Sequence, residues 1–199
     1  MLHLPRIRGG VHPAGHKDRS SALPISPIPL PKRLVLPLRQ HAGAEAQPIV
    51  RVGERVLKGQ LIAMPLSEVS APVHASSSGT VVEVGSVLAP HPSGLTANAI
   101  VIECDGRDEW MPFDIPSDPY SEAPLTLADR VAAAGIVGLG GAIFPAAVKL
   151  KQGVRHEIKT LLVNGSECEP YLTTDDRLMR ERAEDVIDGA RLIQHILRA

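Results

Sequence analysis

The chain has 199 residues, a formal net charge of −1 and 44% hydrophobic residues, but only 3% are aromatic. That length allows one large or two small domains with aliphatic cores. The balanced charge gives no electrostatic case for nucleic acid as a partner, and no run approaches the ~18 apolar residues of a membrane span. Cys104 and Cys168 are far apart and form no C-x-x-C pair, so we expect no iron–sulfur cluster within the chain.

Residues 1–33 are expected to form an extended N-terminal arm, because their many prolines lack the N–H that helices and sheets need. His12 and His16 have the four-residue spacing of a helical metal site. Pro13 and Gly15 disfavour that helix, so no metal site is expected.

Residues 34–104 contain several short apolar runs separated by turn residues, which predicts a small β barrel or sandwich. The expected strands lie within residues 34–38, 49–52, 53–60, 61–64, 71–75, 79–84 and 98–103. The pattern resembles the biotinyl/lipoyl-like barrel-sandwich fold. Carrier domains of that fold need a lysine on an exposed hairpin, and residues 64–70 contain none, so neither covalent biotin nor lipoate is expected.

Residues 105–124 are rich in proline and are expected to be a linker, with Trp110 and Phe113 packed between two domains. In residues 125–199 a variant capping box at Thr126–Asp129 predicts a helix start, and Gly135 is a plausible helix end. A short helix is expected at 146–152. The apolar run 158–163 predicts a buried parallel strand.

Helical patterns then follow from Thr174, a possible N-terminal cap. The last helix is expected to place its apolar side chains on one face; these are Val186, Ala190, Ile193 and Leu197.

Two loops contain the residues that we expect to bind a ligand. Gly138, Gly140 and Gly141 precede a helix that carries Lys149, and free N–H groups at a helix start suit an anion such as phosphate. Residues 164–170 (Asn-Gly-Ser-Glu-Cys-Glu-Pro) offer polar side chains for a ring or a ribose. A glycine-rich loop alone is a weak signal, and this one has neither the Rossmann nor the P-loop spacing.

Taken together, the two motifs resemble the flavin site of the NADH-binding flavoprotein subunit of respiratory complex I. They are closer still to the C subunit of the Rnf (Rsx) electron-transport complex. Gly9–Pro13 and Asp175–Met179 also look like that family, so the resemblance covers nearly the whole chain.

The resemblance implies an α+β chain in which a barrel-sandwich domain precedes a truncated, Rossmann-like α/β domain that binds FMN and NADH. It places Phe144 against the nicotinamide dinucleotide, Lys149 and Asn164 against the flavin, and Glu169 beside the nicotinamide as the catalytic residue. Hydride would then pass from NADH to the flavin. The implied cofactor-binding residues are Gly138, Gly140, Gly141, Ala142, Phe144, Lys149, Asn164, Ser166, Glu167 and Glu169.

The resemblance further implies electron transfer between NADH, FMN and iron–sulfur centres, coupled to ion transport. The expected partners are the other subunits of a membrane complex and a ferredoxin-like carrier, at the cytoplasmic face of a bacterial inner membrane. Two [4Fe-4S] clusters are expected only in a missing C-terminal part, and the isolated fragment is expected to be inactive. The alternatives are a cobalamin reductase-like flavoprotein, in which the flavin region generally comes first, and a non-catalytic barrel-sandwich docking module.

Two positions depart from the family pattern. Ile143 replaces a glycine, and a β-branched residue disfavours positive φ and fills space; we expect it to narrow the flavin pocket if that glycine permits close approach. Ser166 replaces an aspartate of complex I, which removes a negative charge near the flavin.

Overall fold

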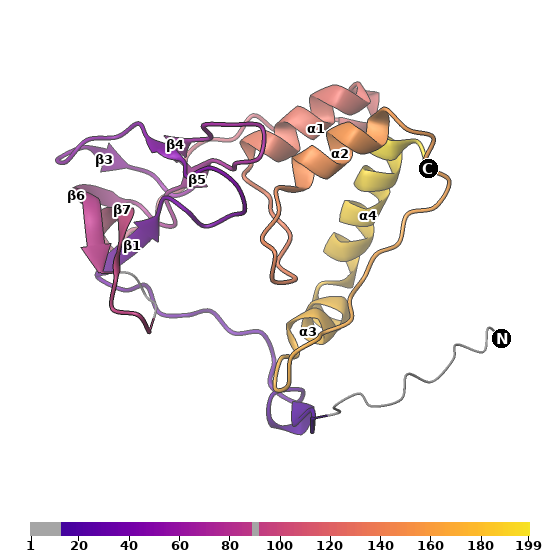
Figure 1. Cartoon of the computed structure of the whole chain (residues 1–199), viewed down its shortest axis with the longest axis horizontal. Coiled ribbons are helices and arrows are strands. Elements are labelled where there is room, and N and C mark those ends of the chain that lie inside the picture. Colours follow the sequence, from indigo (N-terminus) through magenta and orange to yellow (C-terminus); the bar gives the residue numbers. More distant parts are fainter. Residues whose placement is uncertain (1–12, 89–91) are drawn as a thin grey trace. The chain divides into compact units, whose positions relative to one another are not determined.

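The computed structural model describes residues 13–88 and 92–199. These residues form two compact units. One unit contains residues 13–27 and 162–189, and the other contains residues 28–88, 92–161 and 190–199. Figure 1 labels the helices and strands of both units.

The larger unit contains two antiparallel sheets. The first has the strand order β1-β7-β6-β3, formed by Arg33–Pro37, Thr96–Cys104, Gly79–Leu88 and Arg55–Val56. The second has the order β2-β4-β5, formed by Gln47–Pro48, Leu61–Met64 and Val73–His74. Val81 pairs with Ile102 and Val35 with Val101.

Residues from both sheets fill one aliphatic core, in which Val56, Ile62, Val81, Ile100 and Ile102 are fully buried. The predicted small barrel or sandwich is therefore confirmed at the level of the fold. The strand expected at 49–52 is wrong, because β2 lies at Gln47–Pro48 instead. Gly53 has φ 92 and the Glu54 N–H bonds to the Arg51 carbonyl, so the chain turns there.

Helix α1 spans Pro124–Ala133 and α2 spans Ala146–Val154, and they pack side by side (Figure 1). The predicted capping box is wrong, because α1 begins at Pro124 and Thr126 already lies within it. Proline suits this first turn, since its missing N–H would have had no partner inside the helix.

The predicted end of α1 at Gly135 is confirmed by its hydrogen bonds. Gly135 has φ 69 and donates to the Ala132 carbonyl, while Ile136 donates to the Val131 carbonyl. These two bonds define a Schellman motif, which favours glycine at the left-handed position. The helix expected at 146–152 is also confirmed and continues to Val154.

Two further helices follow. Helix α3 spans Thr174–Glu181, and α4 spans Ala183–Leu197. Thr173 occupies the N-cap position of α3 and makes no side-chain cap bond, so the predicted Thr174 cap is wrong by one residue. Within the larger unit, Ile196 of α4 is fully buried against α1 and α2, in a cluster with Leu127, Ala128 and Leu150.

The buried parallel strand predicted at 158–163 is wrong. These residues form no strand, and Leu162 and Val163 are 86% and 62% exposed. A strand needs neighbours for its backbone hydrogen bonds, and the strands in the described part of the chain form only the two antiparallel sheets. Apolar character alone therefore did not decide the conformation.

Trp110 and Phe113 do not form a buried contact between domains. Both are more than half exposed and lie against each other, with ring centroids 5.4 Å apart. They cover Gly59 of the barrel, where an added Cβ would lie 2.8 Å from the Phe113 ring. Lys58 Nζ lies 4.7 Å from the centre of the Trp110 ring, a cation–π distance.

Candidate functional site

The glycine-rich loop belongs to the larger unit, where backbone bonds pin both of its ends. The Gly138 N–H donates to the Phe144 carbonyl and the Ala146 N–H to the Ile136 carbonyl, each at 2.9 Å. Residues 138–143 between these ends are exposed. At Gly140 and Gly141 an added Cβ would meet nothing within 4 Å, so the loop leaves open space above its backbone.

Ile143 occupies a left-handed backbone conformation, with φ 47. Its carbonyl accepts a hydrogen bond from the Ala42 N–H at 2.9 Å, which ties this end of the loop to the barrel. The position where the family pattern has glycine is therefore one where glycine is conformationally preferred. For a β-branched residue this conformation is an outlier.

Phe144 and Lys149 lie on the same side of the loop. Lys149 is exposed, and its Nζ lies 5.7 Å from the centre of the Phe144 ring. An aromatic face and an exposed ammonium group beside an open glycine loop can hold a flat, anionic ligand. The expectation of free N–H groups at the helix start is wrong for Ala146, because its N–H already bonds to Ile136.

The second loop belongs to the smaller unit, and Glu167 helps to hold it. One Glu167 oxygen accepts the Asp175 N–H at 3.0 Å, and the other lies 3.8 Å from Lys17 Nζ. Glu167 thus satisfies an N–H in the first turn of α3, the function that sequence analysis gave to Thr174. A carboxylate there is also favoured by the helix dipole.

The side chains of Asn164 and Glu169 differ in whether they accept a hydrogen bond. The Asn164 side-chain oxygen accepts the Ser166 N–H at 2.9 Å, a local turn that orients Ser166. Glu169 is exposed, and within residues 13–88 and 92–199 its carboxylate has no hydrogen-bond or ion-pair partner. Its carboxylate is therefore open to a ligand, whereas that of Glu167 is occupied.

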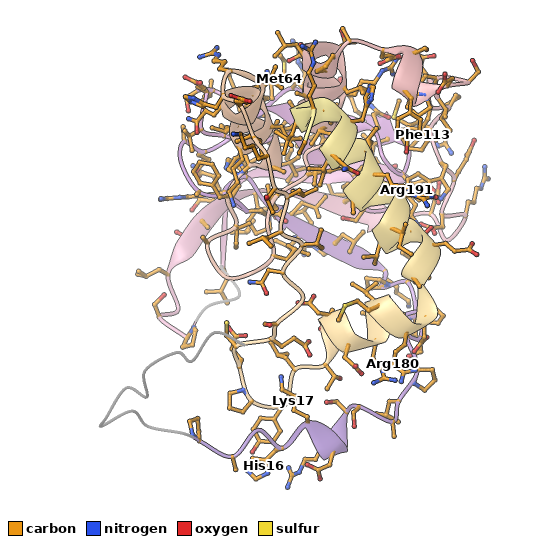
Figure 2. All side chains as sticks on the ribbon, turned by 90° about the vertical axis from the view of Figure 1, so that its right-hand side faces the viewer. His16, Lys17, Met64, Phe113, Arg180 and Arg191 are labelled. Atoms are coloured by element: carbon orange, nitrogen blue, oxygen red, sulfur yellow. The ribbon has the colours of Figure 1, made fainter. Side chains whose placement is uncertain are left out.

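The N-terminal arm contributes residues that sequence analysis missed. Lys17 Nζ donates to the carbonyls of Glu169 and Leu172 at 3.2 and 2.7 Å (Figure 2). The His16 ring stacks on Tyr171 with centroids 5.1 Å apart. Sequence spacing could not have revealed these contacts, although the arm's likeness to the Rnf family near residue 13 was a signal that the arm takes part.

The arm is also fixed further along the chain. The Ile25 N–H donates to Glu181 at 3.0 Å, and Arg177 bonds both to Glu181 and to the Ser21 carbonyl, the latter at 3.1 Å. The Arg177 hydrogen bond, helped by the Ile25 N–H and opposed by desolvation, holds the pKa of Glu181 below its usual value. The charged form of Glu181 therefore stabilises the arm.

The two motifs fall in different units, and each unit brings its own predicted residues together. Gly138, Gly140, Gly141, Ala142, Phe144 and Lys149 share one loop and helix start, and Asn164, Ser166, Glu167 and Glu169 share the other loop. In the described part of the chain, no three His, Cys, Asp or Glu side chains are arranged to hold a metal ion. His12 lies outside the described residues.

Comparison with known proteins agrees with this geometry. Residues 5–107 match the RnfC barrel sandwich hybrid domain, and residues 131–199 match the Nuo51 FMN-binding domain. The chain thus joins a barrel-sandwich domain to part of a flavin-binding domain.

Named relatives extend the match over nearly the whole chain. The C subunit of the ion-translocating oxidoreductase complex of Rhodobacter capsulatus is 52% identical over 96% of this chain and 37% of its own length. The protein of the same name from Pseudomonas aeruginosa is 52% identical over 99% of this chain and 26% of its own length. The chain belongs to the RnfC family, and it spans 26% to 37% of the length of these curated relatives.

Among the described residues, every helix is too short or too polar to cross a lipid bilayer.

Proposed function

We propose that this chain contributes the flavin-binding part of an electron-transfer protein, which passes electrons between NADH, FMN and iron–sulfur centres in an ion-translocating complex. The observation that carries the proposal is the open glycine loop flanked by Phe144 and Lys149, in residues that match an FMN-binding domain. FMN supplies the redox chemistry when bound, since it accepts a hydride and releases electrons singly.

The chain's own residues have separate roles in this proposal. Lys149 neutralises the ligand's phosphate, and the Gly138–Ile143 backbone allows close approach. Phe144 provides an apolar face for the nicotinamide. Asn164 and Ser166 offer polar contacts, Glu167 holds its loop in place, and the unpaired Glu169 carboxylate faces the nicotinamide of NADH.

The wider setting is also a proposal. The names of the relatives support an assembly with other subunits of an ion-translocating oxidoreductase complex. We further propose a place at the cytoplasmic face of a bacterial inner membrane, with a ferredoxin-like electron carrier and NADH as partners. The two [4Fe-4S] clusters are proposed for the whole protein. A Rossmann-like arrangement of the flavin domain is proposed from the match to the FMN-binding domain, and it requires strands. Residues 131–199 form none here apart from an isolated bridge between Val137 and Pro145.

A flavin fluorescence titration of the full-length protein tests the site. Lys149→Ala removes one charge-assisted contact, which contributes about 1.5–3 kcal/mol, so FMN affinity should fall roughly 10- to 100-fold. Lys151→Ala is the matched control, because Lys151 lies on the same helix but pairs with Asp129 at 2.6 Å. Equal FMN affinities for the two variants would refute the role of Lys149.

Glu169→Gln separates hydride transfer from flavin binding. Its carboxylate has no partner among the described residues, so the substitution should leave the loop and FMN retention nearly unchanged. NADH-dependent bleaching of bound FMN should slow, because the group proposed to lie beside the nicotinamide has lost its charge. Bleaching at the wild-type rate would contradict the assignment.

A further inference from the structure

Lys17 is hydrogen-bonded to Glu169 in the second loop, although the two residues are 152 positions apart in the sequence. Its Nζ donates to the main-chain carbonyls of Glu169 and Leu172 at 3.2 and 2.7 Å, and lies 3.8 Å from a Glu167 oxygen. One ammonium group therefore bridges three points of the loop.

Neighbouring arm residues hold the same loop independently of Lys17. The Tyr171 N–H donates to the Gly15 carbonyl at 2.7 Å, and the Ser20 hydroxyl donates to the Tyr171 carbonyl at 2.6 Å. Tyr171 has φ 69, a conformation that a tyrosine adopts rarely. The loop therefore has a particular backbone shape, which contacts from the arm hold in place.

Lys17 holds the loop through its hydrogen bonds to main-chain carbonyls, rather than through its ion pair with Glu167. The Lys17 side chain is 39% exposed, and its pair with Glu167 at 3.8 Å is at the long end of such contacts, so the pair contributes little. Charge-assisted hydrogen bonds to carbonyls are stronger. They act on the main chain of Glu169, whose own side chain is unpaired within residues 13–88 and 92–199.

We propose that Lys17 is a positioning residue for Glu169: by holding the carbonyls of Glu169 and Leu172, it fixes the loop that presents the Glu169 carboxylate to NADH. This inference rests on the proposed function of Glu169, and Lys17 itself is not a catalytic residue. Its contribution is to keep the loop ordered before the ligand arrives, which reduces the ordering that binding would otherwise require.

The first experiment needs no flavin. The Tyr171 N–H is hydrogen-bonded to the Gly15 carbonyl and the Ser166 N–H to Asn164, so hydrogen–deuterium exchange labelling of the loop amides, followed by peptide mass spectrometry, reports loop order. Lys17→Met should raise the labelling rate of residues 164–172 roughly 10-fold, as expected for loss of a charge-assisted bond. Lys17→Arg, which keeps the charge and donors, should label close to the wild-type rate. Lys159→Met, at an exposed lysine of the other unit, should have no effect.

The second experiment measures NADH-dependent bleaching of FMN bound to the full-length protein. Lys17→Met should raise the apparent KM for NADH roughly 10-fold more than it lowers the limiting rate, and Lys17→Arg should restore it. Labelling and bleaching of Lys17→Met that match Lys159→Met would overturn the proposal. Faster labelling with unchanged kinetics would mean that Lys17 only stabilises the loop, and this result would also overturn the proposal. Failure of the wild type to bind FMN, with the labelling difference retained, would instead reject the proposed function and with it the positioning role.

Discussion

Ile143 has a left-handed backbone conformation, so we expect its glycine variant to be more stable than its alanine variant. At most positions the alanine variant is the more stable of the two. Ile143 has φ 47 and is 38% exposed. Ile143→Ala removes most of the side chain but keeps a Cβ in a left-handed conformation. Ile143→Gly removes the same contacts and also the Cβ, so the difference between the two variants isolates the backbone effect.

The size of that difference follows from two opposing contributions. A left-handed conformation costs a residue with a Cβ about 1–2 kcal/mol. Glycine loses about 0.4–1 kcal/mol more chain entropy on folding than alanine. Ile143→Gly should therefore be more stable than Ile143→Ala by about 1 kcal/mol. Urea unfolding followed by far-UV circular dichroism measures both free energies.

Leu139 is the matched control in the same loop, because it is 89% exposed and is not among the residues with positive φ. There the order should be the ordinary one, with Leu139→Ala more stable than Leu139→Gly by about 0.4–1 kcal/mol. An Ile143→Ala variant as stable as Ile143→Gly would refute the left-handed conformation. We also expect Ile143→Gly to bind FMN at least as tightly as the wild type, since it removes a side chain from the loop.

Three other predictions follow from the structure. Burial holds the pKa of His74 below its usual value, although a backbone hydrogen bond at Ala133 partly opposes the shift. Between this lowered pKa and the unfolded-state pKa of about 6.5, the unfolded chain binds more protons than the folded chain, so the free energy of unfolding should fall as the pH drops below about 6.5. Urea unfolding at several pH values should show this fall for the wild type and a weaker one for His74→Gln. Glu167→Ala removes the partner of the Asp175 N–H and should cost about 0.5–2 kcal/mol of stability, whereas Glu169→Ala in the same loop should change stability by less than about 0.5 kcal/mol; equal losses would contradict the capping role. Limited proteolysis should cut first within the proposed linker, residues 105–124, and a resistant fragment that spans it would reject that boundary.

Sequence alone determined the features that depend on local chemistry. Short apolar runs between turn residues predicted the barrel strands at 61–64, 79–84 and 98–103, and the structure has strands there. Gly135 ends its helix because glycine alone adopts a left-handed conformation without strain. The two motifs indicated the RnfC family, since their residue types and spacing can be seen in the chain itself.

Tertiary structure decided whatever depends on partners that are distant in sequence. Residues 158–163 have the composition of a strand but no neighbouring strand in the described residues, so their backbone does not join a sheet. The Glu167 carboxylate accepts the Asp175 N–H of α3 and lies near Lys17, and the sequence predicted neither contact. The role of Lys17 was invisible because a hydrogen bond depends on distance in space, and a separation of 152 residues along the chain says nothing about that distance.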